Sequence, residues 1–117
     1  MKTYLTIEVG GTYTKSALMG ADGALLRRYD RVPTAQGSEA DFLTMLTGLV
    51  RRAQGESALD GAALSAPGMI DSAQGIMHTG GSLFVIDQMP VARLLTAETG
   101  IAVSVENDAH CAALAEV

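Results

Sequence analysis

Apolar and polar residues alternate along the first third of the chain, as they do in β-strands. Alternation over residues 5–9 predicts a strand that buries one of its faces. A second strand is predicted over 14–20, and a more polar third strand, near a sheet edge, over 24–32. The Ala-Asp-Gly sequence at 21–23 is typical of a hairpin turn. The chain is therefore expected to begin as three consecutive strands.

Helices and short apolar strands follow. Apolar residues recur at helical spacing from Phe42 to Ala53, after a candidate N-cap at Ser38, and predict an amphipathic helix. A second helix is predicted between Pro90 and Gly100. The apolar runs at 62–66 and 101–105 are typical of strands covered on both faces. A further helix is predicted from Asn107 to the end of the sequence. The predicted order of elements is therefore β-β-β-α-β-α-β-α.

The last predicted helix begins near Asn107 and runs to the end of the sequence. Its end at Val117 has no C-cap glycine, no basic last turn and no following proline. We therefore expect residues 1–117 to be the front part of a longer protein, interrupted within this helix.

Composition narrows the possible classes of protein. The chain has 117 residues, 48% of them hydrophobic, which suits one packed domain. A net charge of −5 argues against nucleic acid as a partner. The single cysteine, Cys111, excludes an internal disulfide. With no signal peptide after Met1 and no apolar run long enough to span a membrane, we expect a cytoplasmic protein.

The glycines after the first strand are the first candidate for chemistry. Two consecutive glycines between strands most often form only a tight turn with positive φ. The spacing is not that of a Walker P-loop, and no helix follows, as a Rossmann fingerprint requires. Yet Gly10 and Gly11 would let a phosphate approach backbone N–H groups, with the Thr12 hydroxyl and the Lys15 cation nearby. Glu8 could hold Mg²⁺ through water.

The junction of the last strand and the last helix is the second candidate. Asn107 and Asp108 are both good N-cap residues, so a plain helix cap is one interpretation. The other is functional, because open α/β sheets bind ligands at the carboxyl ends of their strands. A carboxylate kept ionised by the helix N-terminus could accept a hydroxyl proton there.

Together these stretches resemble the ROK family of repressors, open reading frames and sugar kinases. VGGTYTK is similar to its first phosphate motif, SAPGMID to its sugar loop, and VENDAHCAALAE to its sugar-binding and catalytic motif. The resemblance extends from Thr3 to Glu116. It implies an α/β fold, the N-terminal lobe of a ribonuclease-H-like (actin-like) ATPase, with a mixed five-stranded sheet and helices on both faces.

The resemblance also implies roles for the sugar-facing residues. Asp108 would be the general base that takes a proton from the sugar hydroxyl as it attacks the γ-phosphate of ATP. Asn107 would bind neighbouring hydroxyls. Gly68 and Ser82 would border the sugar, a hexose or N-acyl-hexosamine.

Gly10, Gly11, Thr12 and Lys15 would face the phosphates of ATP. The family has Asp where this chain has Glu8, and the extra methylene moves the carboxylate by about 1 Å or more. The position of Mg²⁺ is therefore in question, because about 1 Å of misplacement can cost on the order of 10²-fold in rate.

A second lobe, beyond residue 117, would carry the adenosine motif, further sugar contacts, the zinc cluster and the main homodimer surface. No zinc site is expected within this chain, and the chain alone is expected to be inactive. Two alternatives to a kinase remain open. One is the sugar-sensing half of a ROK repressor, although a repressor carries a helix-turn-helix before the first strand. The other is a non-catalytic fragment.

Overall fold

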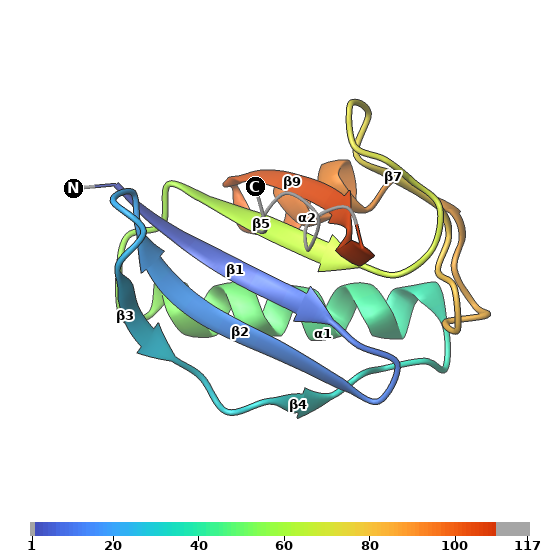
Figure 1. Cartoon of the computed structure of the whole chain (residues 1–117), viewed down its shortest axis with the longest axis horizontal. Helices are drawn as coiled ribbons and strands as arrows, with labels where there is room; N and C mark the ends of the chain where they lie inside the picture. The colour runs from blue at the N-terminus through green and yellow to red at the C-terminus, as the bar shows by residue number, and fades with distance from the viewer. Residues whose placement is uncertain (1, 110–117) are drawn as a thin grey trace.

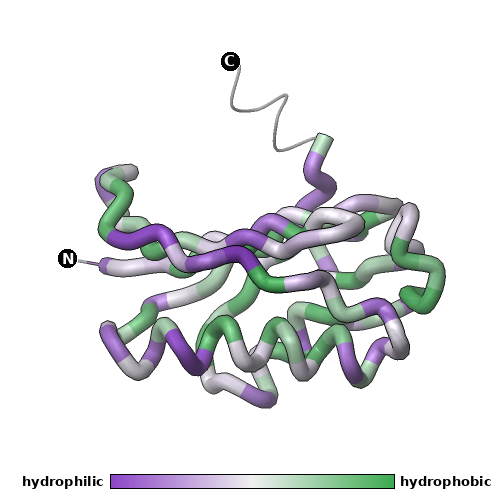
Figure 2. Tube along the Cα trace, turned by 90° about the horizontal axis from the view of Figure 1, so that it is seen from below, coloured by the Kyte–Doolittle hydropathy of each residue, from purple (hydrophilic) through white to green (hydrophobic). Residues whose placement is uncertain are grey.

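The structure is a computed structural model that describes residues 2–109. Two helices lie along one face of a mixed sheet, and Figure 1 shows both behind the strands. Figure 2 shows the same layers edge-on. The elements are, in chain order, β1 (Thr3–Val9), β2 (Tyr13–Gly20), β3 (Leu25–Arg28), β4 (Val32–Pro33), α1 (Glu39–Gln54), β5 (Gly61–Ala66), β6 (Ile70–Asp71), β7 (Ile76–Thr79), β8 (Asp87–Met89), α2 (Val91–Thr99) and β9 (Ala102–Asn107).

The main sheet has the strand order β3-β2-β1-β5-β9, and the short β4 also pairs with β2. β1 and β2 are antiparallel, whereas β1, β5 and β9 are parallel. The five predicted strands are thus present, with β4 as a sixth, and the predicted ribonuclease-H-like fold class is confirmed. The parallel arrangement brings the carboxyl ends of β1, β5 and β9 to one edge of the sheet.

One hydrophobic core lies between the sheet and the helices. Leu5, Ile7 and Val9 of β1 are buried there, while Glu8 points to the other face and is exposed. A slip of one residue in register would expose all three apolar side chains, so burial fixes the register of β1. The largest fully buried side chains are Phe42, Leu5, Ile7, Leu46, Met77 and Leu83.

The predicted third strand is interrupted. β3 ends at Arg28, and pairing resumes only at β4. Tyr29 still donates its N–H to the Ser16 carbonyl of β2 at 3.1 Å, and its buried side chain donates from its hydroxyl to Glu56 at 2.8 Å. Burial is the main cause that raises the pKa of Tyr29, and the hydrogen bond to Glu56 raises it further. The phenol therefore stays a neutral donor.

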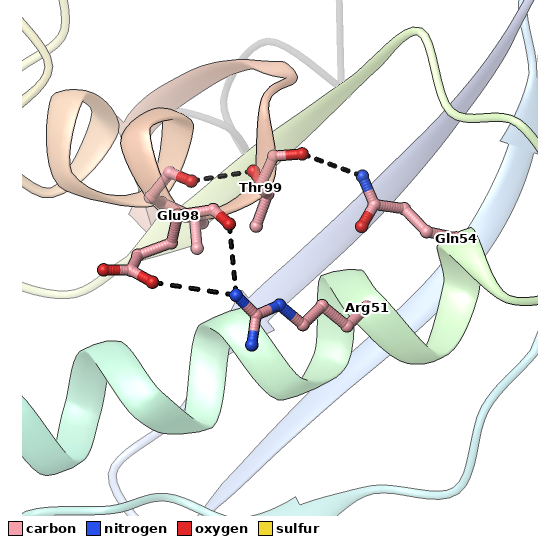
Figure 3. Close-up of polar contacts among 5 residues, drawn as sticks. Arg51, Gln54, Glu98 and Thr99 are labelled. Atoms are coloured by element: carbon pink, nitrogen blue, oxygen red, sulfur yellow. Dashed lines mark hydrogen bonds and ion pairs between the residues drawn. The ribbon is translucent and has the colours of Figure 1, made fainter.

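Polar contacts between the helices hold α1 beside α2 (Figure 3). Arg51 of α1 donates to the Glu98 carbonyl at 3.3 Å and lies 3.7 Å from its carboxylate. Gln54 donates to the Thr99 carbonyl at 3.0 Å. The predicted start of α1 is confirmed, because the Ser38 hydroxyl accepts from an α1 backbone N–H at 3.0 Å.

Asp108 and Ala109 begin the last predicted helix, whose remainder, with Cys111, lies outside the described residues. The expected helical cover of the second sheet face depends on that helix and stays a prediction. No helix within residues 2–109 combines the length and the apolarity needed to cross a membrane.

A second, three-stranded sheet formed by β6, β7 and β8 was not predicted. Its strands are two to four residues long, too short for their alternation to stand out in the sequence. Met77 and Met89 pair across it and are buried against the main core. This small sheet positions the loop at 80–86, which reaches the candidate site.

Candidate functional site

The predicted site residues gather at the carboxyl ends of the three parallel strands. The turn at 10–12 follows β1, Gly68 comes two residues after β5, and Asn107 ends β9. The register aligns Glu8 with Ser65 and Ser65 with Glu106, so the three strands end side by side. Segments nearly one hundred residues apart in sequence therefore meet at one edge of the sheet (Figure 1).

The glycine turn is shaped by close contact and not by a left-handed backbone. The Gly10 N–H donates to the Tyr13 carbonyl at 2.9 Å, and a Cβ on Gly10 would lie 2.7 Å from that oxygen. Neither Gly10 nor Gly11 has a positive φ. The pair does form a tight turn between two strands, but the expected positive φ is wrong; Gly10 is needed because a side chain would collide with backbone.

Two residues outside the predicted motifs, Thr34 and Gln36, hold this turn. Thr34 donates its hydroxyl to the Gly10 carbonyl at 2.8 Å and its backbone N–H to the Thr12 carbonyl at 2.9 Å. The Gln36 side chain donates to the Gly11 carbonyl. Within residues 2–109, the N–H groups of Gly11 and Thr12 have no protein acceptor. The turn thus presents two backbone donors to a ligand.

Glu8 and Lys15 are cross-strand neighbours on the sheet face away from α1 and α2. Both are exposed, and neither belongs to an ion pair within the described part of the chain. With Arg28 and Arg31 they line a depression of about 760 Å³. Lys15 is thus available to an anion, and Glu8 to a cation.

A Mg²⁺ ion is compatible with this arrangement. No group of three or more candidate metal ligands occurs within residues 2–109. Mg²⁺ in phosphoryl-transfer sites needs only one or two carboxylates, because waters and substrate phosphates complete its shell. Glu8 alone can therefore serve as its protein ligand, directly or through water.

Asn107 joins the predicted catalytic segment to the predicted sugar loop. Its side-chain amide donates to the Gly68 carbonyl at 2.7 Å, and its side-chain oxygen accepts from the Ala109 N–H at 2.9 Å. Asn107 is therefore the helix cap that one interpretation proposed, and the same bonds orient it toward the Gly68 loop. Asp108 follows it in the first turn of the helix and is exposed.

Gly68 occupies a position that only glycine fits. Its φ is +99°, and a Cβ there would lie 2.6 Å from the Gly81 nitrogen. Gly81 has a φ of +60° and packs against Pro67. A Cβ placed on Gly81 would lie 3.2 Å from the Cβ of Pro67. The Gly68 loop and the loop at 80–86 are thus packed backbone to backbone.

Ser82 lies at the turn at 10–12. Its hydroxyl oxygen is 3.1 Å from the ideal Cβ position of Gly11. The adjacent Gly81 contacts Gly68, so the 80–86 loop connects the turn to the Gly68 loop. Neither contact was predictable from sequence, because both depend on how the second sheet folds back.

Comparisons with known proteins agree with this geometry. The ROK family model matches residues 4–117. The chain is 36% identical to a beta-glucoside kinase of Klebsiella pneumoniae, over 93% of this chain and 35% of that protein. It is 32% identical to an N-acetyl-D-glucosamine kinase of Histophilus somni, over 97% and 37% of the respective lengths.

Among solved structures, a ROK hexokinase from Thermus thermophilus matches this chain with a TM-score of 0.84 and 28% sequence identity. The match covers 97% of this chain and 38% of the hexokinase chain. The chain thus spans little more than a third of the length of these relatives. Because the family model matches almost every residue, the chain belongs to the ROK family.

Proposed function

We propose that the protein carrying this chain is an ATP-dependent kinase of a hexose or N-acyl-hexosamine hydroxyl, and that residues 1–117 form its N-terminal lobe. The observation that carries the proposal is the meeting of three features at one sheet edge: the turn at 10–12, the Gly68 loop, and Asn107 with Asp108. The sugars named for the relatives support the substrate class.

In the proposed reaction the sugar hydroxyl gives its proton to the Asp108 carboxylate while its oxygen attacks the γ-phosphorus of ATP, and ADP leaves with the electron pair of the broken P–O bond. The N–H groups of Gly11 and Thr12 bind phosphate oxygens, and Lys15 adds positive charge. Asn107 and Gly68 orient the sugar. Glu8 would hold a Mg²⁺ ion, directly or through water, and that ion would neutralise phosphate charge.

We further propose that a second lobe supplies the adenosine contacts, the remaining sugar contacts, any zinc cluster and the homodimer surface. The share of the relatives that the chain covers supports this view. Residues 1–117 alone would then hold half of a cleft and be inactive. A cytoplasmic location, where ATP is available, fits the proposed reaction.

The test is Asp108→Asn in the complete gene product, assayed by ADP release with glucose, N-acetylglucosamine and cellobiose. We expect kcat to fall by at least about 10²-fold, because general-base catalysis contributes that much or more. Sugar affinity should be retained. Asp22→Asn, in a distant turn, is the matched control. Near-normal turnover of Asp108→Asn would contradict the assignment.

The second candidate is a sugar sensor that binds without catalysis. The observation that favours it is Glu8, which places the carboxylate further out than the aspartate of the family motif. Calorimetric titration separates the two functions. A sensor binds sugar but releases no ADP at saturating Mg-ATP, whereas a kinase does both.

A further inference from the structure

We propose that Thr34 is a positioning residue of the phosphate turn. Together with Gln36 it holds the turn's carbonyl groups on one side, so that the N–H groups of Gly11 and Thr12 are presented together on the other. The inference rests on the proposed function for the identity of the ligand, the phosphates of ATP.

The first argument is the geometry of the peptide unit. In a trans peptide the C=O and the following N–H point in opposite directions. No peptide bond within residues 2–109 is cis. The Gly10 carbonyl shares its peptide unit with the Gly11 N–H, and the Gly11 carbonyl shares its unit with the Thr12 N–H. Bonds from Thr34 and Gln36 to these carbonyls therefore direct both N–H groups away from the 34–36 segment.

The second argument is the direction of a buried hydroxyl chain. The hydroxyl oxygens of Thr14 and Thr34 lie 2.8 Å apart, and both residues are buried. Thr34 has a single hydroxyl hydrogen, which goes to the Gly10 carbonyl. Thr14 must therefore be the donor to Thr34. The chain of hydrogen bonds runs from the Thr14 hydroxyl of β2 to the Thr34 hydroxyl and on to the Gly10 carbonyl, and it fixes the Thr34 side chain.

The third argument is that the same segment also anchors the loop that touches the turn. Five residues after Thr34 the chain enters α1 at Glu39, whose carboxylate accepts from the Asp87 N–H at 3.0 Å. Asp87 begins β8, directly after the loop that carries Ser82, whose hydroxyl lies beside Gly11. The segment from Thr34 to Glu39 therefore braces the turn and its neighbouring loop together.

The test compares Thr34→Val, Thr34→Ser and Thr47→Val in the complete gene product. Valine keeps the shape of threonine and loses the hydroxyl, whereas serine keeps the hydroxyl. Thr47 is a matched control, because it is also buried and its hydroxyl has no hydrogen-bond partner within the described residues.

We expect Thr34→Val to lower kcat/KM for ATP by about 10- to 10²-fold, the cost of misplacing a phosphate-binding group by up to about 1 Å. The KM for the sugar should stay unchanged. Thr34→Ser should restore most of the loss, and Thr47→Val should match the wild type. Equal kcat/KM for ATP in Thr34→Val and the wild type would overturn the inference while leaving the kinase proposal intact.

A double variant addresses the possibility that Thr34→Val fails to fold. Thr14→Val with Thr34→Val removes both hydroxyls, so no buried donor is left unpaired, and such paired replacements can be nearly neutral for stability. We expect the double variant to melt close to the wild type and still to bind ATP weakly. Recovery of wild-type ATP affinity in the double variant would mean that Thr34 has only a structural role.

A readout without catalysis separates this inference from the proposed function. Inorganic tripolyphosphate should shift the amide NMR signals of Gly11 and Thr12 in the wild type, and should shift them much less in Thr34→Val. If these shifts occur but no sugar is phosphorylated, the kinase proposal fails and the positioning role stands. If the amides do not respond in the wild type, the positioning role is refuted.

Discussion

The two glycine turns that join β1 to β2 and β2 to β3 in the main sheet are built on different physical grounds. The turn between β2 and β3 is local. Gly23 has a φ of +88° and donates to the Gly20 carbonyl at 3.0 Å, and the Asp22 carboxylate accepts from the Ala24 N–H at 3.0 Å. No atom lies within 4 Å of a Cβ placed on Gly23. This glycine serves only the backbone conformation of its own turn.

The turn between β1 and β2 depends on distant residues instead. Gly10 has no positive φ, and its carbonyl is held by Thr34, 24 residues away. Ser82, from another sheet, contacts Gly11. A turn that needed only to reverse the chain would not require these partners. Long-range bonds on the carbonyl side, with N–H groups opposite that have no partner within residues 2–109, are what the proposed phosphate-binding role requires of this turn.

Gly10→Ala should break this comparison at its strongest point. The new Cβ would meet the Tyr13 carbonyl at 2.7 Å, where only backbone movement can relieve the contact. We expect kcat/KM for ATP to fall by about 10²-fold, since displacement of the turn by about 1 Å misplaces both N–H donors. Gly48→Ala is the control, because nothing lies near its Cβ position and alanine favours a helix. Unchanged ATP kinetics would show that the close contact has no functional consequence.

Glu8→Asp should sharpen the comparison between the two turns, because it tests the position of the carboxylate beside the β1–β2 turn. If the longer arm of Glu8 misplaces Mg²⁺, aspartate restores the position of the carboxylate in the family motif. We expect a gain of a few-fold in turnover at saturating Mg²⁺ and ATP, smaller than the loss in Gly10→Ala. Steady-state kinetics across a Mg²⁺ titration measure the effect. No gain would refute the misplacement, although the kinase proposal would stand.

Gly23→Ala should have the smallest effect on function. Alanine is strained at a φ of +88°, so we expect a loss of about 1–2 kcal/mol in the free energy of unfolding. Kinetics with ATP and sugar should equal those of the wild type. Denaturant melts and steady-state assays check both parts, and Gly23→Asn, which tolerates this conformation better, is the control. A loss of ATP affinity in Gly23→Ala would remove the contrast between the two turns.

Periodicity predicted the elements that bury a regular face. Residues 5–9 and the helix containing Phe42 and Leu46 were found because their apolar positions repeat with a period of two or about 3.6. The break between β3 and β4 was missed, and so was the bond from the buried Tyr29 to Glu56. Local patterning cannot reveal a tertiary contact of that kind.

Only those residues of the candidate site that belong to a sequence motif were predictable. The Gly-Gly turn and the pair of Asn107 and Asp108 stood out by residue type, and the structure brings them to one edge. Thr34 did not stand out, because a threonine in a loop carries no signal of its own. Its role exists only once β4 has paired with β2 and placed it beneath the turn.

The parallel pairing of β1 with β5 has a consequence for how the molecule assembles. Tyr4 pairs with Gly61, and the Thr3 N–H donates to the Asp60 carboxylate across 57 residues of sequence. Such long loops close slowly, whereas the β1–β2 hairpin forms from neighbouring residues. We infer that the hairpin is an early folding unit and that the edge formed by β5 and β9 is completed late. The ligand-binding edge would then have no counterpart in a partly folded chain, and binding would select the fully folded molecule.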